Sequence, residues 1–149
     1  MNEKVFSVLV GALAIALIVV GCGSSEPDPL TKAEFIKQGN AICVQAGQER
    51  EAALKEAAKE GTQGSEESSE AELDRYVTEV ALPPIQKMTD ELDGLGAPKK
   101  DEKQVEAIVA GFEEDIEKLE ADPHSALGGD PFTGANKLAA AYGLTECKI

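Results

Sequence analysis

The sequence predicts an all-α domain, a small bundle of about four helices. Apolar residues recur at helical spacing in several segments, and capping boxes precede two of these segments. No segment has the alternating pattern of a convincing strand. The chain has 149 residues. Roughly 110 of them can fold once the N-terminal segment is set aside, which is enough for one small domain.

The first helix is expected to begin at a capping box, Thr31 to Glu34, with Leu30 and Phe35 as a hydrophobic staple across it. Residues 61–69 are rich in Gly, Ser and Glu, so they predict a solvated acidic loop after this helix. Between these limits, small and apolar residues keep a helical spacing to about Lys59: they are Phe35, Gly39, Ile42, Cys43, Ala46, Ala53, Leu54 and Ala57.

A second helix is predicted behind another capping box, Ser69 to Glu72. Pro83 and Pro84 lack an amide hydrogen and restrict the residue before them, so we expect a kink, or a break and restart, at that point. The apolar residues before the prolines are Leu73, Tyr76, Val77 and Val80, and those on a rotated face after them are Ile85, Met88, Leu92 and Leu95.

The third helix has the clearest pattern. Its apolar residues fall within an arc of about 100°; they are Val105, Ile108, Val109, Phe112, Ile116 and Leu119. A loop is expected over residues 123–129. Asp130 as the N-cap and Pro131 at the first helical position then predict a short last helix, which ends at Tyr142 with Gly143 directly after it.

An uncharged apolar run, Val5 to Val20, follows Lys4 and has the zones of a signal peptide. As a helix it would reach roughly 24 Å, short of a ~30 Å hydrocarbon core, so a permanent transmembrane anchor is the weaker alternative. The run closes on Val19-Val20-Gly21-Cys22, which resembles the lipobox of bacterial lipoproteins. Cleavage without lipidation is the other alternative, but it would leave an unpaired extracytoplasmic cysteine.

The lipobox resemblance implies cleavage before Cys22 and a diacylglycerol thioether on its sulfur. Residues 1–21 are then the signal peptide, 22–30 the lipidated cysteine and its tether, and 31–149 the helical domain. The implied location is the extracytoplasmic face of the cell membrane, to which two or three acyl chains such as palmitate attach a protein durably. The membrane is therefore an expected partner.

The two remaining cysteines, Cys43 in the first helix and Cys147 after the last, are expected to pair in an oxidising envelope. Closing a loop of about 100 residues contributes about 4.7 kcal/mol in the chain-entropy model. Redox-active thiols or metal ligands are the alternative, but the chain has no CxxC spacing and a single histidine, His124. The expected fold is thus a small disulfide-stapled all-α bundle of about four helices after a lipoprotein signal peptide.

Four short motifs widen the resemblance: the lipobox, AEFIKQGNAIC in the first helix, LPP in mid-chain and AAAYGLTEC near the end. Together they look like a group of small actinobacterial-type lipoproteins and secreted proteins of unassigned function. The group implies a helical domain joined by a cysteine of the first helix and a C-terminal one after Tyr-Gly. Cys43, Cys147, Tyr142 and Gly143 match that pattern.

The formal net charge of −14 and the presence of only two arginines, Arg50 and Arg75, exclude nucleic acid as a partner. Motifs of serine hydrolases, P-loop proteins and zinc proteases are absent from the sequence. A small helical bundle with few aromatic residues also rarely holds a sugar between paired carboxylates. We therefore expect no enzymatic activity and no cofactor.

A stripe of glutamates flanks the apolar arc of the third helix, within about 60° of one another. It could attract Ca²⁺ or a cationic peptide, because hard cations take oxygen ligands. A solvated flank that keeps an acidic protein soluble is the simpler interpretation, so no metal site is expected. The weak metal candidates are Glu106, Glu113 and Glu117, with Glu102 and Glu120 on the same stripe.

Two functions are left open. The first is a non-catalytic envelope module that binds an envelope protein or a cell-wall component, through a groove near Pro83 and Pro84 or through the acidic flank. The alternative is a carrier that holds a small apolar or cationic ligand at the membrane surface. A pocket between the helices would favour the carrier, whereas a solid core with an exposed apolar patch would favour the module.

Overall fold

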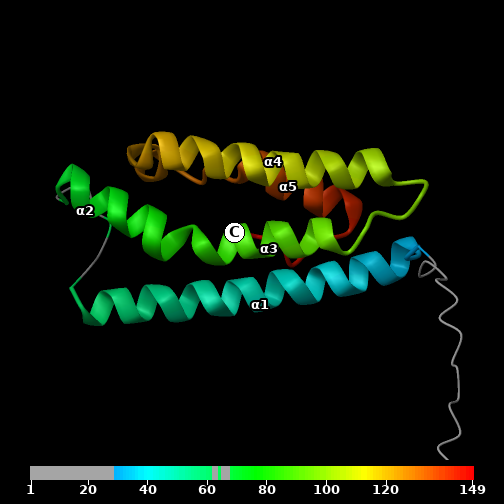
Figure 1. Cartoon of the computed structure of the whole chain (residues 1–149), viewed down its shortest axis with the longest axis horizontal. Coiled ribbons are helices and arrows are strands. Elements are labelled where there is room, and N and C mark those ends of the chain that lie inside the picture. The colour runs from blue at the N-terminus through cyan, green and yellow to red at the C-terminus, as the bar shows by residue number, and fades with distance from the viewer. Residues whose placement is uncertain (1–28, 62–63, 65–67) are drawn as a thin grey trace, which may run out of the picture.

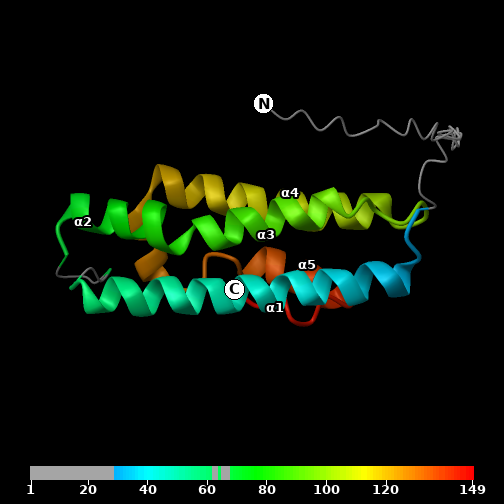
Figure 2. The same cartoon turned by 60° about the horizontal axis from the view of Figure 1, so that its bottom comes forward.

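The computed structural model describes residues 29–61, 64 and 68–149, and these residues form a helical bundle without a strand. The longest helix, α1 (Lys32–Lys59), lies along α3 (Pro83–Gly94), and α4 (Glu102–Ala121) lies on the other side of α3 (Figure 1). A shorter helix, α5 (Thr133–Tyr142), packs against α4, and Figure 2 shows it close to α1 as well. The signal peptide, Cys22 and most of the tether lie outside the described residues.

The first predicted helix is confirmed from its capping box to its end. The hydroxyl of Thr31 accepts the amide hydrogen of Glu34 at 3.3 Å, and the Glu34 carboxylate accepts that of Thr31 at 2.9 Å. Leu30 and Phe35 both join the hydrophobic core, as a hydrophobic staple requires. In the described part of the chain, no helix combines the length and the hydropathy that crossing a bilayer requires.

The second predicted helix is divided into three elements. α2 (Glu70–Arg75) begins at the predicted capping box, η1 (Tyr76–Ala81) is a π-helix, and α3 restarts at Pro83. The break and restart arise because neither Pro83 nor Pro84 can donate to the preceding turn. Instead the amide of Leu82 donates to the carbonyl of Val77 at 2.9 Å, five residues back. The described residues therefore form five α-helices where about four were predicted.

The segment before α5 differs from its prediction. Residues predicted as a loop form a 3₁₀ helix, η2 (Pro123–Gly128). Asp130 is not the N-cap of α5, because Pro131 and Phe132 form a turn and the helix begins at Thr133. The Asp130 carboxylate accepts the amide hydrogen of Phe132 at 2.9 Å, which makes it the first residue of a local turn instead.

The predicted end of the last helix and the predicted disulfide are both confirmed. Gly143 follows Tyr142 with a left-handed φ of 118°, and Leu144 donates to the carbonyl of Ala139 at 2.9 Å, as in a Schellman motif. Cys43 and Cys147 form a disulfide with a Cα–Cα distance of 4.8 Å, and both residues are buried. All six residues of the predicted apolar arc on α4 are also buried.

Candidate ligand pocket

The break at Pro83 opens a pocket inside the bundle. α1 continues straight while η1 and α2 turn away from it (Figures 1 and 2). The resulting pocket has a volume of about 340 Å³, within the range of about 300–1,000 Å³ that small-molecule sites occupy. Most of its wall is apolar and comes from α1, α2, η1, α3, α4 and η2 and from the segments that connect them; large apolar residues on it include Leu54, Leu73, Leu82, Ile85, Leu119 and Phe132.

The π-helix supplies one side of this pocket. Tyr76, Val77 and Ala81 of η1 all line it, and Leu82, which donates the wide-turn hydrogen bond, lies on its floor. π-Helical turns are rare and occur frequently at functional sites, because they displace side chains from the regular helical positions. The proline pair, the π-turn and the pocket are thus one structural unit.

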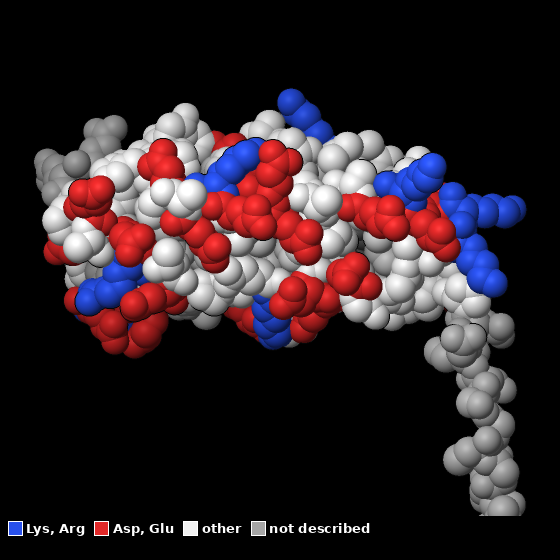
Figure 3. Space-filling view, turned by 45° about the horizontal axis from the view of Figure 1, so that its top comes forward, with Lys and Arg blue, Asp and Glu red and all other residues white. Residues whose placement is uncertain are grey.

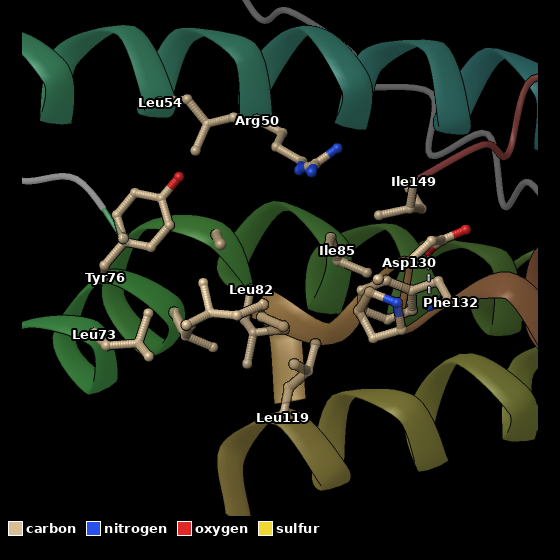
Figure 4. A pocket seen from close by; sticks show the side chains of 17 residues that line it. Arg50, Leu54, Leu73, Tyr76, Leu82, Ile85, Leu119, Asp130, Phe132 and Ile149 are labelled. Carbon is tan, nitrogen blue, oxygen red and sulfur yellow. Dashed lines mark hydrogen bonds between the residues drawn. The ribbon is translucent and has the colours of Figure 1, made fainter. Parts of the chain in front are cut away.

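Arg50 is the one cationic side chain among the described residues that line the pocket. Figure 4 shows its guanidinium projecting from α1 into the space between α1 and α3, towards Ile85 and Ile149. Its Nε is buried and has no hydrogen-bond partner in the part of the chain that the structure describes. Nearly all buried polar groups in proteins have such a partner, so this donor on the pocket wall is available to an acceptor that enters the pocket, such as a ligand oxygen or water.

Two described carboxylates close to Arg50 in the chain or on the pocket wall, Glu49 and Asp130, are already bound by other groups. Glu49, the neighbour of Arg50, accepts a hydrogen bond from Lys87 of α3 at 2.6 Å, which lowers the pKa of Glu49 and raises that of Lys87. Asp130 lines the pocket too, but its carboxylate accepts hydrogen bonds from the amide of Phe132 and the side chain of Thr133. Neither carboxylate pairs with Arg50.

Sequence reasoning missed Arg50 as a site residue, although its position carries a signal. It lies four residues after Ala46 and four before Leu54, so it occupies the core-facing stripe of α1. A cation on an apolar stripe is a feature that periodicity alone could have detected. The apolar members of the stripe suffice to predict the helix, and they do not by themselves point to the cation among them.

Asn40 was missed as well, and it fixes the chain around the disulfide. Its side-chain amide donates to the carbonyl of Gly143 at 3.1 Å and accepts the amide hydrogen of Glu146 at 3.0 Å. Asn40 lies one turn before Cys43 on α1, so the disulfide and these two hydrogen bonds hold the same C-terminal segment. An asparagine three residues before a cysteine has no special meaning until the fold brings the C-terminus to it.

The weak metal candidates are not gathered into a site by the fold. Glu106, Glu113 and Glu117 are all exposed along α4, and acidic side chains are spread over this face of the molecule (Figure 3). His124 lies exposed in η2. Within the described ranges, no group of three or more His, Cys, Asp or Glu side chains is placed to hold a metal ion.

Comparison with known proteins gives no match: no family model fits the chain, and neither a curated protein nor a solved structure is similar enough to it. The pocket and its residues are therefore the basis for assigning a function.

Proposed function

We propose that this chain is a lipid-anchored extracytoplasmic protein whose helical domain carries a small, largely apolar molecule. The pocket beside η1 is the observation that carries the proposal. Of the two functions that the sequence leaves open, a carrier needs a cavity lined by apolar side chains with a few polar groups. The described part of the bundle has such a cavity, of about 340 Å³.

The competing function, an envelope module that binds a protein or a cell-wall component, needs an exposed apolar patch. Among the described residues, the large hydrophobic side chains that are exposed lie on three different elements: Val44 on α1, Leu127 on η2 and Leu138 on α5. Single exposed apolar residues are ordinary on protein surfaces. They give the module less support than the pocket gives the carrier.

The membrane location rests on the lipobox resemblance and on the disulfide. Cys22 lies outside the described residues, so its lipidation stays a prediction from the sequence. Disulfides persist in oxidising compartments, and a pairing of Cys43 with Cys147 agrees with an extracytoplasmic domain. It also leaves Cys22 as the one cysteine of three that is free for a thioether.

Native mass spectrometry of the protein, extracted gently from its own membranes, tests carriage directly. We expect a retained small mass that is lost on unfolding. A variant that fills the pocket, Ala126→Phe in η2, should lose this mass, whereas Ala110→Phe on the exposed face of α4 should keep it. A bare protein, with an envelope protein copurifying instead, would contradict the carrier and support the interaction module.

The anchor is tested separately by cell fractionation. Cys22→Ser should release the protein from the membrane, because a single polar side chain replaces the acyl chains that hold it. Unchanged membrane association of the variant would refute lipidation at this residue while leaving the carrier proposal in place.

A further inference from the structure

The chemistry of the ligand can be narrowed from the polar group that faces it, an inference that rests on the proposed carrier function. We propose that Arg50 binds an oxyanion, and that the ligand is a small amphiphile with a carboxylate-type head and an apolar body. The argument follows from the position of Arg50, its missing partner and the composition of the pocket wall.

Arg50 faces the interior because of its register on α1. Residues four apart lie one above another on a helix, so Ala46, Arg50 and Leu54 form one stripe, and Leu54 lines the pocket with Arg50. A long, charged side chain placed on that stripe is held beside apolar groups. Arg75, the other arginine of the chain, is exposed on α2 and does not line the pocket.

Among the described residues, no hydrogen-bond acceptor for Arg50 is found. Its Nε is buried without a hydrogen bond, Glu49 is bound to Lys87, and Asp130 is bound by the start of α5. A guanidinium presents five donors in a planar fork that matches the two oxygens of a carboxylate. An oxyanion in the pocket would therefore supply the hydrogen-bond acceptors that the described protein groups do not give Arg50.

The rest of the pocket selects an apolar body. Leu82, Ile85 and Phe132 form its deeper wall, and each is at most 3% exposed. The hydroxyl of Tyr76 is directed towards the α1 side of the same space (Figure 4), where it can serve as a second donor to a polar head. Cations, which the sequence left open as ligands, are disfavoured because Arg50 would repel them.

The negative net charge of the protein means that only a nearby cation can make the pocket prefer an anionic ligand. With a formal net charge of −14, the molecule as a whole repels anions. A preference for an anionic over a neutral ligand must therefore come from a local cation. Arg50 is the one cation on the described pocket wall, so replacing it should remove the preference entirely.

The test compares three ligands of equal chain length, octanoate, octanol and octylammonium, by equilibrium dialysis. The full-length chain is used in its membrane-bound form in phosphatidylcholine nanodiscs, with empty nanodiscs as the blank. Arg50→Met removes the charge and keeps a flexible apolar side chain, Arg50→Lys keeps the charge without the fork, and Arg75→Met is the matched control. Because the chain has two arginines, NMR of the arginine Nε–Hε groups shows two assignable signals in the wild type.

We expect octanoate to bind the wild type and Arg75→Met equally and to bind Arg50→Met about ten- to a hundredfold more weakly, as the loss of charge-assisted hydrogen bonds predicts. Arg50→Lys should fall between these values, and octanoate should shift the Nε–Hε signal of Arg50 but not that of Arg75. Octanol should bind the wild type and Arg50→Met alike.

Equal binding of octanoate to the wild type and Arg50→Met, with octanol also bound, would overturn the role of Arg50 and leave the carrier standing. Stronger binding of octylammonium than of octanoate would overturn it as well. If the wild type retains none of the three ligands, the carrier proposal fails together with this inference.

Discussion

The two halves of α1 pack against very different surroundings. We call Phe35 to Cys43 of α1, together with the segment Tyr142 to Cys147 that packs on it, the closed half of the bundle. The two parts are joined by a disulfide, the hydrogen bonds of Asn40 and an edge-on contact between the rings of Phe35 and Tyr142 at 5.9 Å. We call Arg50 to Ala57 of α1, together with the residues that line the cavity of about 340 Å³ beside η1, the pocket half. One helix thus combines a region fixed by many interactions with one that is left incompletely packed.

The difference comes from a few residues. In the closed half, Gly39 lets Leu144 approach so closely that an added Cβ would lie 2.6 Å from its side chain. In the pocket half, Arg50 occupies a position on α1 where the helical spacing would favour an apolar side chain. The segment that faces it, η1, turns away from α1 before Pro83. Tight packing at one end supplies stability, so the other end can keep a cavity and an unsatisfied donor at a cost the domain tolerates.

Removing the disulfide should have the largest effect on the closed half. Cys43→Ser with Cys147→Ser opens a loop with a sequence separation of 104, so the free energy of unfolding should fall by about 4 to 5 kcal/mol. Urea denaturation of the full-length chain measures this loss. A reductant should bring the wild type to the stability of the variant and leave the variant unchanged. An unchanged midpoint would show that the cross-link does not hold the closed half.

The next largest effect is expected at the glycine that turns the chain back towards α1. Gly143→Ala forces a side chain onto a φ of 118° and brings its Cβ within 2.8 Å of Ile36, so unfolding should become easier by about 1–3 kcal/mol.

Gly47→Ala is the matched control, because Gly47 lies exposed in α1 with no atom near the added Cβ. That variant should gain about 0.5–1 kcal/mol from helix propensity. Equal effects of the two substitutions in urea denaturation would show that the turn at Gly143 is not tightly constrained.

Much of the closed half was predictable from local sequence, and most of the pocket half was not. The capping box at Thr31, where α1 begins, and the cap at Gly143 each follow from residues within a few positions of one another. The break and restart at the prolines was predicted, but the π-turn at Tyr76–Ala81 that precedes it was not, because it depends on which carbonyl the amide of Leu82 reaches. Local patterns do not determine that choice, because tertiary packing decides between alternatives of similar energy.

Replacing Arg50 should stabilise the protein, which distinguishes the pocket half from the closed half. Arg50→Met removes a buried donor without a partner, so the ligand-free protein should gain about 1 kcal/mol in its free energy of unfolding. Arg75→Met, on the exposed surface of α2, should change it by less than about 0.5 kcal/mol. Destabilisation by Arg50→Met in urea denaturation would instead show that Arg50 has a structural role.

A dependence of stability on alkaline pH also belongs to the closed half. Burial, and the hydrogen bond from its hydroxyl to Asp101 at 3.1 Å, raise the pKa of Tyr142 from 10.0 to about 12. Between these values the unfolded chain loses the proton while the folded chain keeps it. The stabilising contribution of the protonated Tyr142 to the free energy of unfolding is therefore complete below pH 10 and is lost as the pH rises towards 12.

Tyr142→Phe should flatten this part of the stability profile, as followed by thermal unfolding at several alkaline pH values. An identical pH profile for the wild type and Tyr142→Phe would show that the phenol of Tyr142 does not titrate in this window.

Methyl NMR with octanoate as the added ligand tests most directly the claim that one half of the bundle is a binding site. Our account predicts that methyl signals of the pocket half, such as those of Leu54, Leu82 and Ile85, shift with ligand concentration, while those of Ile36 and Leu144 in the closed half stay still. Shifts spread evenly over both halves, or no shift at Ile85, would contradict it.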